Sequence, residues 1–330
     1  MRTLRELGER WVLRYVARRL EGLPGALLPP GDDAADMLFE GRLVLSSDMM
    51  LESTDIPKGM GFRDVGYKAV TAATSDAAAK GAKPLAYLIS LALPPETTEE
   101  EFKELWRGFE DAVKLYGGRL AGGDTNMGGE IIIDVSCIAS SENPVSRAGA
   151  KPGDLLAVTG MFGAQAAGLH ALLTENRGRN AETVVKRFLR PVARVKEGAA
   201  LTRSNAVSAS MDSSDGLSET LYSLAEASRV GFLVEKPPVD EAAREYAEEN
   251  GLNLFDLVFN GGEEYELVVT VKPSMLEEAV EAVEKVGGRL EVIGRATEDI
   301  ETVKAIWEGK VVKVPRRGYQ HFTSRSASNK

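Results

Sequence analysis

Short acidic motifs flanked by glycine or serine recur along the chain, and their residue types could carry metal and phosphate chemistry. The first is the pair Asp32 and Asp33, which follows a Pro-Pro-Gly turn and is joined downstream by Ser46-Ser47-Asp48. Adjacent carboxylates repel each other, and burying them without a counter-charge is costly. A single Asp-Asp pair is typical of a solvated turn, so only repetition of the pattern favours a cation site.

Four further motifs of the same kind follow the first. They are Ser75-Asp76, Gly122-Gly123-Asp124-Thr125, Asp212-Ser213-Ser214-Asp215-Gly216 and Gly261-Gly262-Glu263-Glu264-Tyr265. Mg²⁺ takes oxygen ligands, usually a few carboxylates together with substrate phosphates and water. Glycines let the backbone approach a phosphate closely, and the free N–H groups of a helix start bind one. The set predicts a metal and polyphosphate site that could transfer a phosphoryl group without a side-chain nucleophile.

The composition is that of a soluble globular protein of about two domains. The 330 residues include 40 basic and 50 acidic ones, giving a formal charge of −10. This balance argues against nucleic-acid and anionic-membrane partners. No apolar run is long enough to span a membrane, and the charged N-terminal stretch lacks a signal-peptide core, so we expect a cytoplasmic protein. The single cysteine, Cys137, lies in an apolar run that predicts a packed strand position.

The signatures of the common nucleotide-binding classes are absent from the sequence. There is no P-loop, no Gly-x-Gly-x-x-Gly and no His-Arg-Asp loop, which excludes P-loop, Rossmann and protein-kinase interpretations. His170 lies in a predicted helix and is interpreted as structural or exposed, while His321 fits a pocket or a packed C-terminal segment equally well. Neither pairs with a cysteine, which argues against zinc. Trp106 is expected in the core.

The predicted elements place these motifs mainly at strand ends and Gly-rich turns. In the first half, periodicity predicts helices over 3–20, 62–80 and about 99–116, and strands over 42–47, 85–93 and 131–139. The segment 48–61 is expected to be a polar loop, so Ser46-Ser47-Asp48 would stand at the C-terminal end of a strand. The run Ser140 to Pro144 has the composition of a linker.

The second half alternates similarly. Strands are predicted over 155–159, 206–211, 266–271, 290–293, 301–306 and 310–314, and helices over 162–173, 181–188, 195–203, 217–229 and 274–286. The Asp212 motif thus joins a strand to a helix. We expect a mixed α/β (α+β) protein of two domains, residues 1–143 and 144–330.

Eight motifs in a fixed order resemble the thiamine-monophosphate kinase family, within the superfamily that includes aminoimidazole ribonucleotide synthetase. Besides the acidic motifs above they include Lys68-Ala69, the run from Ser146 to Asp154, and Gly318-Tyr319. Each motif is weakly specific by itself, whereas the ordered set from Gly31 to Phe322 is highly specific. The resemblance implies the aminoimidazole ribonucleotide synthetase-like fold, with an α/β C-terminal domain and a homodimer whose N-terminal sheets join.

The resemblance also implies a reaction and its ligands. It implies ATP-dependent phosphorylation of thiamine monophosphate to thiamine diphosphate, the last step of thiamine diphosphate synthesis, by direct transfer with several Mg²⁺ ions and ATP near the dimer interface. By motif position the metal ligands would be Asp33, Ser46, Ser47, Asp48, Asp76, Asp124, Asp212 and Asp215. ATP would contact Gly123, Asp124, Arg147 and Ser214, and thiamine phosphate would contact Asp55, Glu263 and Tyr319. A carboxylate and an aromatic face both suit a cationic thiazolium ring.

Three positions depart from the family pattern. Glu264 stands where aspartate is usual, Ser213 replaces an apolar residue, and Lys80 stands where methionine is common before Gly-Ala. Two kinds of alternative remain open. One is another enzyme of the superfamily, although a selenide-activating or hydrogenase-maturation member would be expected to carry a reactive terminal cysteine that is missing here. A purine-synthesis ligase fits the motifs less well. The other is a non-catalytic nucleotide- or metal-binding regulator.

Overall fold

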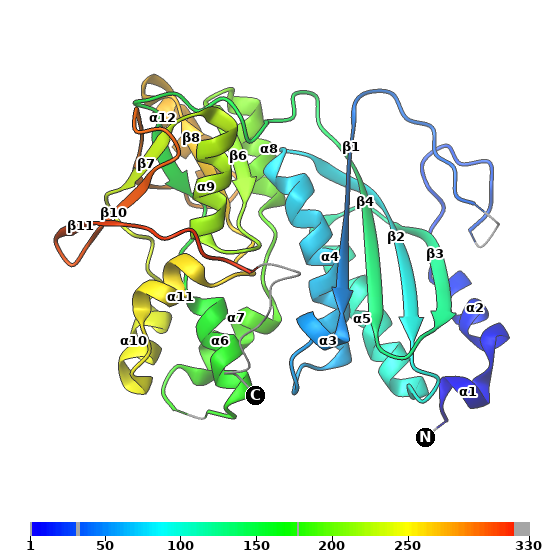
Figure 1. The fold of residues 1–330 in the computed structure, drawn as a ribbon. Helices are drawn as coiled ribbons and strands as arrows, with labels where there is room; N and C mark the ends of the chain where they lie inside the picture. The colour runs from blue at the N-terminus through cyan, green and yellow to red at the C-terminus, as the bar shows by residue number, and fades with distance from the viewer. Residues whose placement is uncertain (1, 31–33, 177, 320–330) are drawn as a thin grey trace.

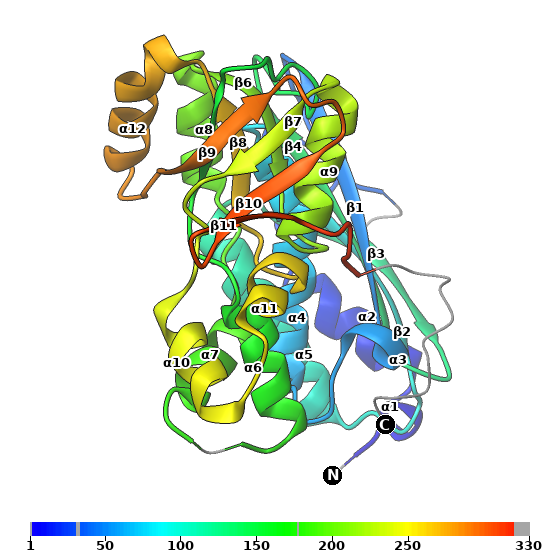
Figure 2. The same ribbon diagram turned by 60° about the vertical axis from the view of Figure 1, so that its left-hand side comes forward.

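The computed structural model describes residues 2–30, 34–176 and 178–319, which form two β-sheets that pack against helices. Figures 1 and 2 show the sheets side by side, with helix α4 (Phe62–Ala79) standing between them. Most of α4 is buried, and it contacts strands or helices of both sheets. Alanine-rich helices can approach their neighbours closely, so the composition of α4 suits a central position.

The N-terminal sheet has four strands in the order β1-β4-β2-β3. They are β1 (Leu43–Leu51), β4 (Ile132–Ser140), β2 (Lys83–Leu93) and β3 (Leu120–Met127). Only the β2–β3 pair is parallel. Helices α4 and α5 (Glu99–Tyr116) cover one face of this sheet (Figure 1). Trp106 of α5 is buried and Cys137 of β4 is buried, which confirms both expectations.

Helices α4 and α5 cross at unusually short range because each presents a glycine to the other. A Cβ atom at Gly66 would lie 2.2 Å from the carbonyl oxygen of Leu105, and one at Gly108 would lie 2.1 Å from that of Arg63. Such contacts are far inside van der Waals distance, so these positions require glycine. The close crossing fixes α4 against the N-terminal sheet.

The opposite face of the N-terminal sheet carries exposed apolar side chains. Because side chains alternate along a strand, β1 presents Leu45 and Met49 outward while its even-numbered residues turn toward α4. These two side chains are 69% and 56% exposed, and Leu88 of β2 on the same face is 39% exposed. We call this surface the open face. Its exposed apolar side chains lie near one another and form a patch, whereas isolated exposed apolar residues are common on protein surfaces.

The C-terminal sheet has seven strands in the order β11-β10-β7-β9-β5-β8-β6. Its strands are β5 (Leu155–Val158), β6 (Val207–Asp212), β7 (Gly231–Val234), β8 (Leu267–Val271), β9 (Glu291–Thr297), β10 (Val303–Trp307) and β11 (Lys310–Lys313). Val268 packs in a cluster with α9 (Leu217–Ser228), while its neighbour Val269 packs in a cluster with α8 (Val195–Ser204) and α12 (Leu276–Glu284). The sheet is therefore covered on both faces, which explains why every residue of β8 is buried and all but Thr270 are apolar.

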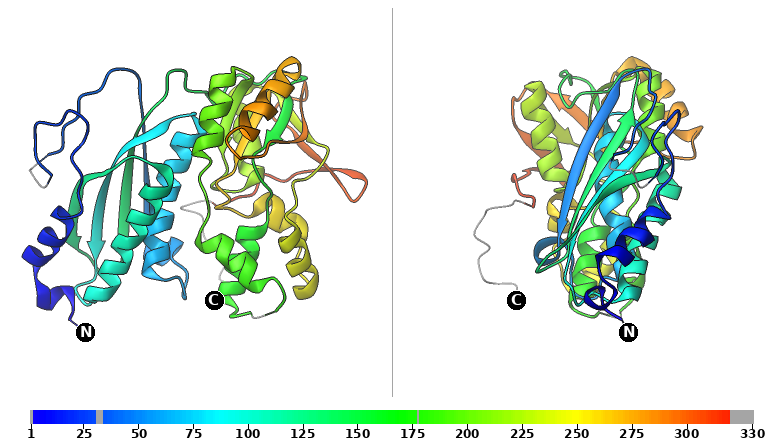
Figure 3. Two further views of the ribbon diagram at one scale, coloured as in Figure 1. Left: turned by 180° about the vertical axis from the view of Figure 1, so that it is seen from behind. Right: turned by 90° about the vertical axis from the view of Figure 1, so that its right-hand side faces the viewer.

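Four further helices lie beside this sheet, as the view from behind in Figure 3 also shows. They are α6 (Ala164–Leu173), α7 (Ala181–Leu189), α10 (Glu241–Asn250) and α11 (Leu254–Asn260). No helix of the described residues is long and apolar enough to cross a membrane. The mixed α/β architecture confirms the expected fold class. The division at 143/144 stays a prediction, and the two sheets lie on either side of it.

The expected elements are largely confirmed, with three corrections. The helix expected over 3–20 is broken at Gly8, whose φ of +74° ends α1 (Leu4–Leu7) before α2 (Glu9–Ala17) begins. The strand expected to end at Ser47 continues to Leu51, and α3 (Glu52–Asp55) follows where a loop was expected. The placement of Ser46-Ser47-Asp48 at a strand end is therefore wrong. Periodicity also missed β7, α10 and α11, and it missed β3, which runs through the Gly122-Gly123-Asp124-Thr125 motif.

Candidate active site

Strand β1 divides its predicted ligands between the two faces of the sheet. Ser46 and Asp48 turn toward α4, and the Ser46 hydroxyl donates a hydrogen bond to the carbonyl oxygen of Ala73 at 2.7 Å. Ser47 points to the open face, where its hydroxyl donates to the Asp134 carboxylate at 2.9 Å. Successive side chains of a strand point in opposite directions, so a continuous strand separates these neighbours.

Four aspartates from different elements approach one another at the seam between the sheets. Asp48 of β1, Asp76 of α4 and Asp212 at the end of β6 interact electrostatically, together with Asp215 of the following turn. Burial and the charges of Asp76 and Asp212 raise the pKa of Asp48 to about 7. Burial, followed by the charge of Asp212, raises the pKa of Asp76 to about 6. Mutual repulsion of this kind favours a bound cation.

Helix α4 connects this acidic group to the C-terminal domain through hydrogen bonds. Asp212 is buried, and its Oδ2 accepts a hydrogen bond of 2.7 Å from the hydroxyl of Ser75. One turn further along, Lys80 Nζ donates to the carbonyl oxygen of Ser210 at 2.7 Å. Arg147, from the segment that joins the two sheets, lies close enough to lower the pKa values of both Asp76 and Asp212. The cations partly offset the charge of the aspartates.

These residues suit a metal ion that is shared with phosphate, not one held by protein ligands alone. Among the side chains that the structure describes, no three His, Cys, Asp or Glu residues converge on one metal position. Mg²⁺ is commonly held by one or two carboxylates with the remaining positions filled by water and substrate phosphates. Burial is the main cause of the raised pKa values of Asp48 and Asp76, and the charges of neighbouring aspartates add to it, so a bound cation would offset both effects. The donor set therefore fits Mg²⁺.

The Asp212–Gly216 turn is joined to the Gly-Gly-Glu-Glu-Tyr motif by the backbone. The N–H of Glu263 donates to the carbonyl oxygen of Ser214 at 2.6 Å, and that of Tyr265 donates to Ser213 at 2.9 Å. A Cβ atom at Gly262 would lie 2.6 Å from the Ser214 carbonyl oxygen, so glycine is needed for this approach. Two motifs about fifty residues apart in sequence thus form one surface.

The second of these motifs faces a buried lysine of α4. Lys68 is completely buried, and its Nζ lies 2.6 Å from Oε2 of Glu263. Asp55, at the end of α3, interacts electrostatically with the same ammonium group, and its Oδ2 accepts a hydrogen bond from the N–H of Leu51 at 2.9 Å. The two predicted substrate carboxylates, Asp55 and Glu263, are therefore brought together around a single cation.

Tyr265 interacts electrostatically with both the acidic group and the substrate carboxylates. Its ring is buried, and burial raises the pKa of its hydroxyl well above the usual value, with further increases from the charges of Glu263 and Asp48. Glu263 and Tyr265 both adopt left-handed backbone conformations, with φ of 67° and 54°. Non-glycine residues in this conformation store strain that is typical of functional sites. Because charges from both groups act on Tyr265, the predicted metal subsite and the predicted thiamine phosphate subsite lie near each other.

The chain returns to this surface near its C-terminal end. The N–H of Tyr319 donates to the carbonyl oxygen of Asp215 at 3.2 Å, and a Cβ atom at Gly318 would lie 2.5 Å from that oxygen. Tyr319 is half-buried there. The motif Gly318-Tyr319 is therefore held against the Asp212–Gly216 turn, and His321 lies outside the described residues.

Glu264 points away from the substrate carboxylates. It is buried, and its Oε1 accepts a hydrogen bond of 2.7 Å from the N–H of Gly163, which precedes the first residue of α6. Burial raises the pKa of Glu264 well above its usual value. The glutamate at position 264, where the family usually has aspartate, therefore contacts the start of α6 and not the substrate carboxylates.

A cavity of about 340 Å³ adjoins Glu264. Its lining includes Arg187, Arg190 and Arg194. Each guanidinium group is already paired: with Asp240, with Asp64, and with Glu266. Paired arginines of this kind link α7 and α8 to the surrounding elements and leave little net positive charge for an anion.

The remaining predicted ligands lie elsewhere in this structure. Gly123 and Asp124 are in β3, with Asp124 exposed on the open face, and Asp33 lies outside the described residues. A Cβ atom at Gly123 would lie 1.7 Å from the carbonyl oxygen of Ile89, so that position needs glycine. Asp124 and Asp134 both face Ser90 of β2 from the neighbouring strands. Sequence reasoning gave Asp134 no role, although the two-residue alternation of its strand could have indicated it.

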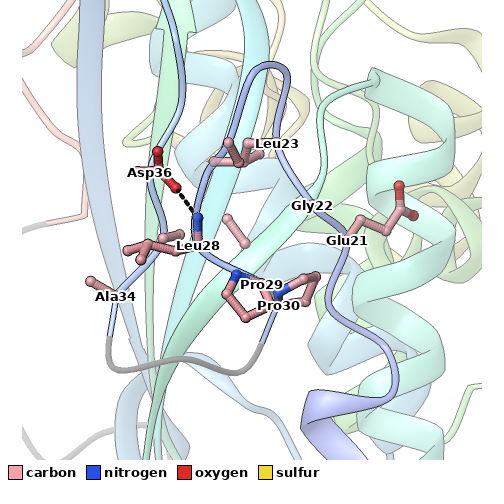
Figure 4. A pocket seen from close by; sticks show the side chains of 11 residues that line it. Glu21, Gly22, Leu23, Leu28, Pro29, Pro30, Ala34 and Asp36 are labelled. Carbon is pink, nitrogen blue, oxygen red and sulfur yellow. Dashed lines mark hydrogen bonds between the residues drawn. The ribbon is translucent and has the colours of Figure 1, made fainter.

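Asp36, shortly after the first acidic motif, binds the backbone of an earlier part of the chain. Asp36 accepts a hydrogen bond of 2.9 Å from the N–H of Leu28 (Figure 4) and another of 3.1 Å from the N–H of Leu27. These bonds, that of Leu28 first, lower the pKa of the Asp36 carboxyl. A cavity of about 10 Å³, room for a water molecule, lies beside it. Asp36 thus links these two parts of the chain.

The structure also tests the sequence interpretation of His170 and shows three side chains that had no predicted role. His170 lies in α6, and its Nδ1 is 2.9 Å from the Tyr246 hydroxyl, in agreement with a structural role. Sequence reasoning assigned no function to Lys68, Ser75 or Tyr265. Their motifs were noticed, but only the fold shows that these side chains connect the predicted ligands.

Comparison with known proteins first defines the class. Residues 31–140 match the AIR synthase related protein N-terminal domain, and residues 151–305 match the corresponding C-terminal domain. The matches cover most of the chain; the first contains all four strands of the N-terminal sheet, and the second contains the C-terminal sheet as far as β10. The chain is thus a two-domain AIR synthase related protein.

Individual relatives narrow this assignment. Thiamine-monophosphate kinase of Nitrosopumilus maritimus (strain SCM1) is 33% identical over 88% of this chain and 93% of its own length. The enzyme of the same name from Pyrococcus horikoshii is 35% identical over 88% of this chain and 90% of its own length. A solved structure described as AaThiL complexed with AMPPCP and TMP is 29% identical, with a TM-score of 0.77 over 98% of this chain and 99% of that one. The chain belongs to the thiamine-monophosphate kinase family.

Proposed function

We propose that this protein transfers the γ-phosphoryl group of ATP directly to thiamine monophosphate and so forms thiamine diphosphate, the last step in making that cofactor. One observation carries the proposal. The charges of Asp48 and Asp212 and those of Asp55 and Glu263 all act on the hydroxyl of the same buried side chain, Tyr265, which supports two neighbouring subsites. A metal-phosphate subsite next to a subsite for a cationic ring matches the two ends of the acceptor.

Each predicted residue receives a role under this proposal. The metal ligands are Asp33, Ser46, Ser47, Asp48, Asp76, Asp124, Asp212 and Asp215, with Arg147, Ser214 and Gly123 contacting ATP together with Asp124. Bound Mg²⁺ would neutralise phosphate charge as the phosphoryl group moves in line between oxygens. Arg147 binds phosphate through its guanidinium, and Ser214 offers the hydroxyl of a turn that precedes α9. Asp55, Glu263 and Tyr319 orient thiamine phosphate, so the chain needs no nucleophile of its own.

We propose that the protein acts as a homodimer joined through the open face. The exposed Leu45, Met49 and Leu88 supply an apolar contact surface, and a second copy would cover them. Gly123 and Asp124 lie on β3 of the same sheet, so a dimer of this kind would place the ATP contacts next to the interface. Residues 1–143 would then form the ATP-binding and dimerisation domain, and residues 144–330 would complete the metal and substrate site.

The test is ADP release from ATP and Mg²⁺, with thiamine monophosphate compared with free thiamine as acceptor. We expect turnover with the monophosphate only, and we expect Asp212→Asn to abolish it because that variant removes the central buried carboxylate. Glu281→Gln, which changes one charge in the exposed part of α12, is the matched control and should behave as wild type. ATP binding without ADP formation would instead indicate a regulator, and turnover with neither acceptor would refute the kinase assignment.

A further inference from the structure

Lys68 is a charged side chain that the proposed reaction does not use directly. It lies on α4 of the N-terminal domain with no exposed surface, and its Nζ is 2.6 Å from Glu263 Oε2 in the C-terminal domain. The same ammonium group lies 3.7 Å from the centre of the Phe188 ring. Lys68 thus contacts Glu263 and Phe188. Because its side chain has no exposed surface, it is not available to a phosphate in this structure.

A buried ammonium group needs a reason to be charged. Removing it from water costs several kcal/mol, in order of magnitude, and burial lowers the pKa of Lys68. The charge of Glu263, the hydrogen bond to it and the charge of Asp55 act in the opposite direction. The cation is therefore retained by the two carboxylates that the proposed function assigns to the thiamine ring.

The carboxylate that Lys68 holds is attached to a strained backbone. Glu263 has a φ of 67°, and its N–H is fixed to the Ser214 carbonyl oxygen at 2.6 Å. The backbone bond sets where the side chain starts, but the Glu263 side chain is 30% exposed and could turn toward solvent. The ion pair with Lys68 is the contact that directs the carboxylate inward, across the boundary between the domains.

Lys68 could influence a cationic ring in two ways that have opposite signs. Through charge alone, an ammonium group repels a thiazolium, so removing it would strengthen binding. Through position, it fixes the carboxylate that the ring must meet, so removing it would weaken binding. The 2.6 Å contact and the complete burial of Lys68 favour the second effect, because repulsion through charge alone would require neither a close contact with Glu263 nor burial of the ammonium group.

We propose that Lys68 is a positioning residue that holds Glu263 in place for the thiazolium end of the acceptor, and that it acts mainly through Glu263, the carboxylate it contacts. The inference rests on the proposed function, since it takes thiamine monophosphate as the ligand. It assigns no contact between Lys68 and ATP. Affinity for thiamine monophosphate should therefore depend on Lys68, whereas affinity for ATP should not.

The experiment measures thiamine monophosphate binding by calorimetry, and KM and kcat for both substrates, in Lys68→Met. This variant keeps a flexible side chain of similar length against Phe188. We expect the dissociation constant and the KM for thiamine monophosphate to rise by about tenfold or more, with the KM for ATP unchanged. Unchanged or tighter binding of thiamine monophosphate would overturn the proposal.

A double-variant cycle separates positioning from a general structural role. If Lys68 acts through Glu263, Lys68→Met should have little further effect on binding in the Glu263→Gln background. Full additivity of the two substitutions would contradict the inference. Lys68→Gln keeps a neutral donor for Glu263 and should therefore lose less affinity for thiamine monophosphate than Lys68→Met. It serves as the second variant if the Lys68→Met protein does not fold. Wild-type affinity of Lys68→Gln for thiamine monophosphate would overturn the proposal. A wild-type protein that binds thiamine monophosphate without turnover would refute the proposed reaction, and the binding cycle would still test Lys68.

Discussion

Asp48→Asn should stabilise the metal-free protein at neutral and alkaline pH, although it removes a proposed metal ligand. Burial and the neighbouring charges of Asp76 and Asp212 raise the pKa of Asp48 from 3.8 to about 7. The folded protein therefore holds this proton more tightly than the unfolded chain does. Stability must fall as pH rises between these two values, and the loss is complete above pH 7. Asparagine is neutral throughout and avoids the loss.

The size of the effect follows from the two pKa values. A tenfold change in proton affinity corresponds to about 1.4 kcal/mol, so a pKa raised from 3.8 to about 7 costs the ionised folded state at most about 4 kcal/mol. At pH 8 the whole cost applies to the wild type. At pH 5 the unfolded chain is largely ionised while the folded carboxyl is still protonated, so less than half of the cost has developed.

Urea denaturation in the presence of EDTA at pH 5 and pH 8 measures this difference. We expect the stability gain of Asp48→Asn over wild type to be larger at pH 8 by about 2–3 kcal/mol, and Mg²⁺ to reduce it by compensating the wild-type charge. Asp124→Asn is the matched control, since it removes the same charge from an exposed site on the open face. An equal effect of Asp48→Asn at the two pH values, or destabilisation at pH 8, would refute the electrostatic reasoning.

Three further substitutions test other parts of the seam and the fold. Ser75→Ala removes the 2.7 Å hydrogen bond to buried Asp212, so urea denaturation should show a loss of about 1–3 kcal/mol; an unchanged midpoint would contradict it. Lys80→Met removes a cation from the acidic group, so titration should show Mg²⁺ binding severalfold more tightly, and weaker binding would argue against the electrostatic role. Gly66→Ala places a Cβ atom 2.2 Å from the Leu105 carbonyl oxygen, so thermal denaturation should show a loss of several kcal/mol, roughly, and a near-native melting temperature would show that the helices can separate.

Much of the fold could be predicted because local patterns decide it. The alternation of β4 and the capped, amphipathic pattern of α5 were read correctly, since each depends on residues a few positions apart. The errors have physical causes as well. Gly8 broke an apparently continuous helix by adopting a positive φ, and short elements such as β7 carry too few residues for a period to be recognised.

The sequence by itself determined the family of this protein and the chemistry that we propose for it. Carboxylates next to glycine and serine, repeated in a fixed order, specify oxygen ligands for a hard cation and close approach to phosphate. That information is local, because it depends on residue types and on neighbours in the chain. It was enough to indicate the family and most residues of the candidate site.

Only the tertiary structure decided which of these residues meet. Pairing along β1 turns Asp48 toward α4 and Ser47 toward the open face, although they are neighbours in sequence. Lys68 and Glu263 lie 195 positions apart and form a 2.6 Å ion pair, because α4 packs between the two sheets. Such contacts depend on how distant elements pack, and no local pattern encodes that arrangement.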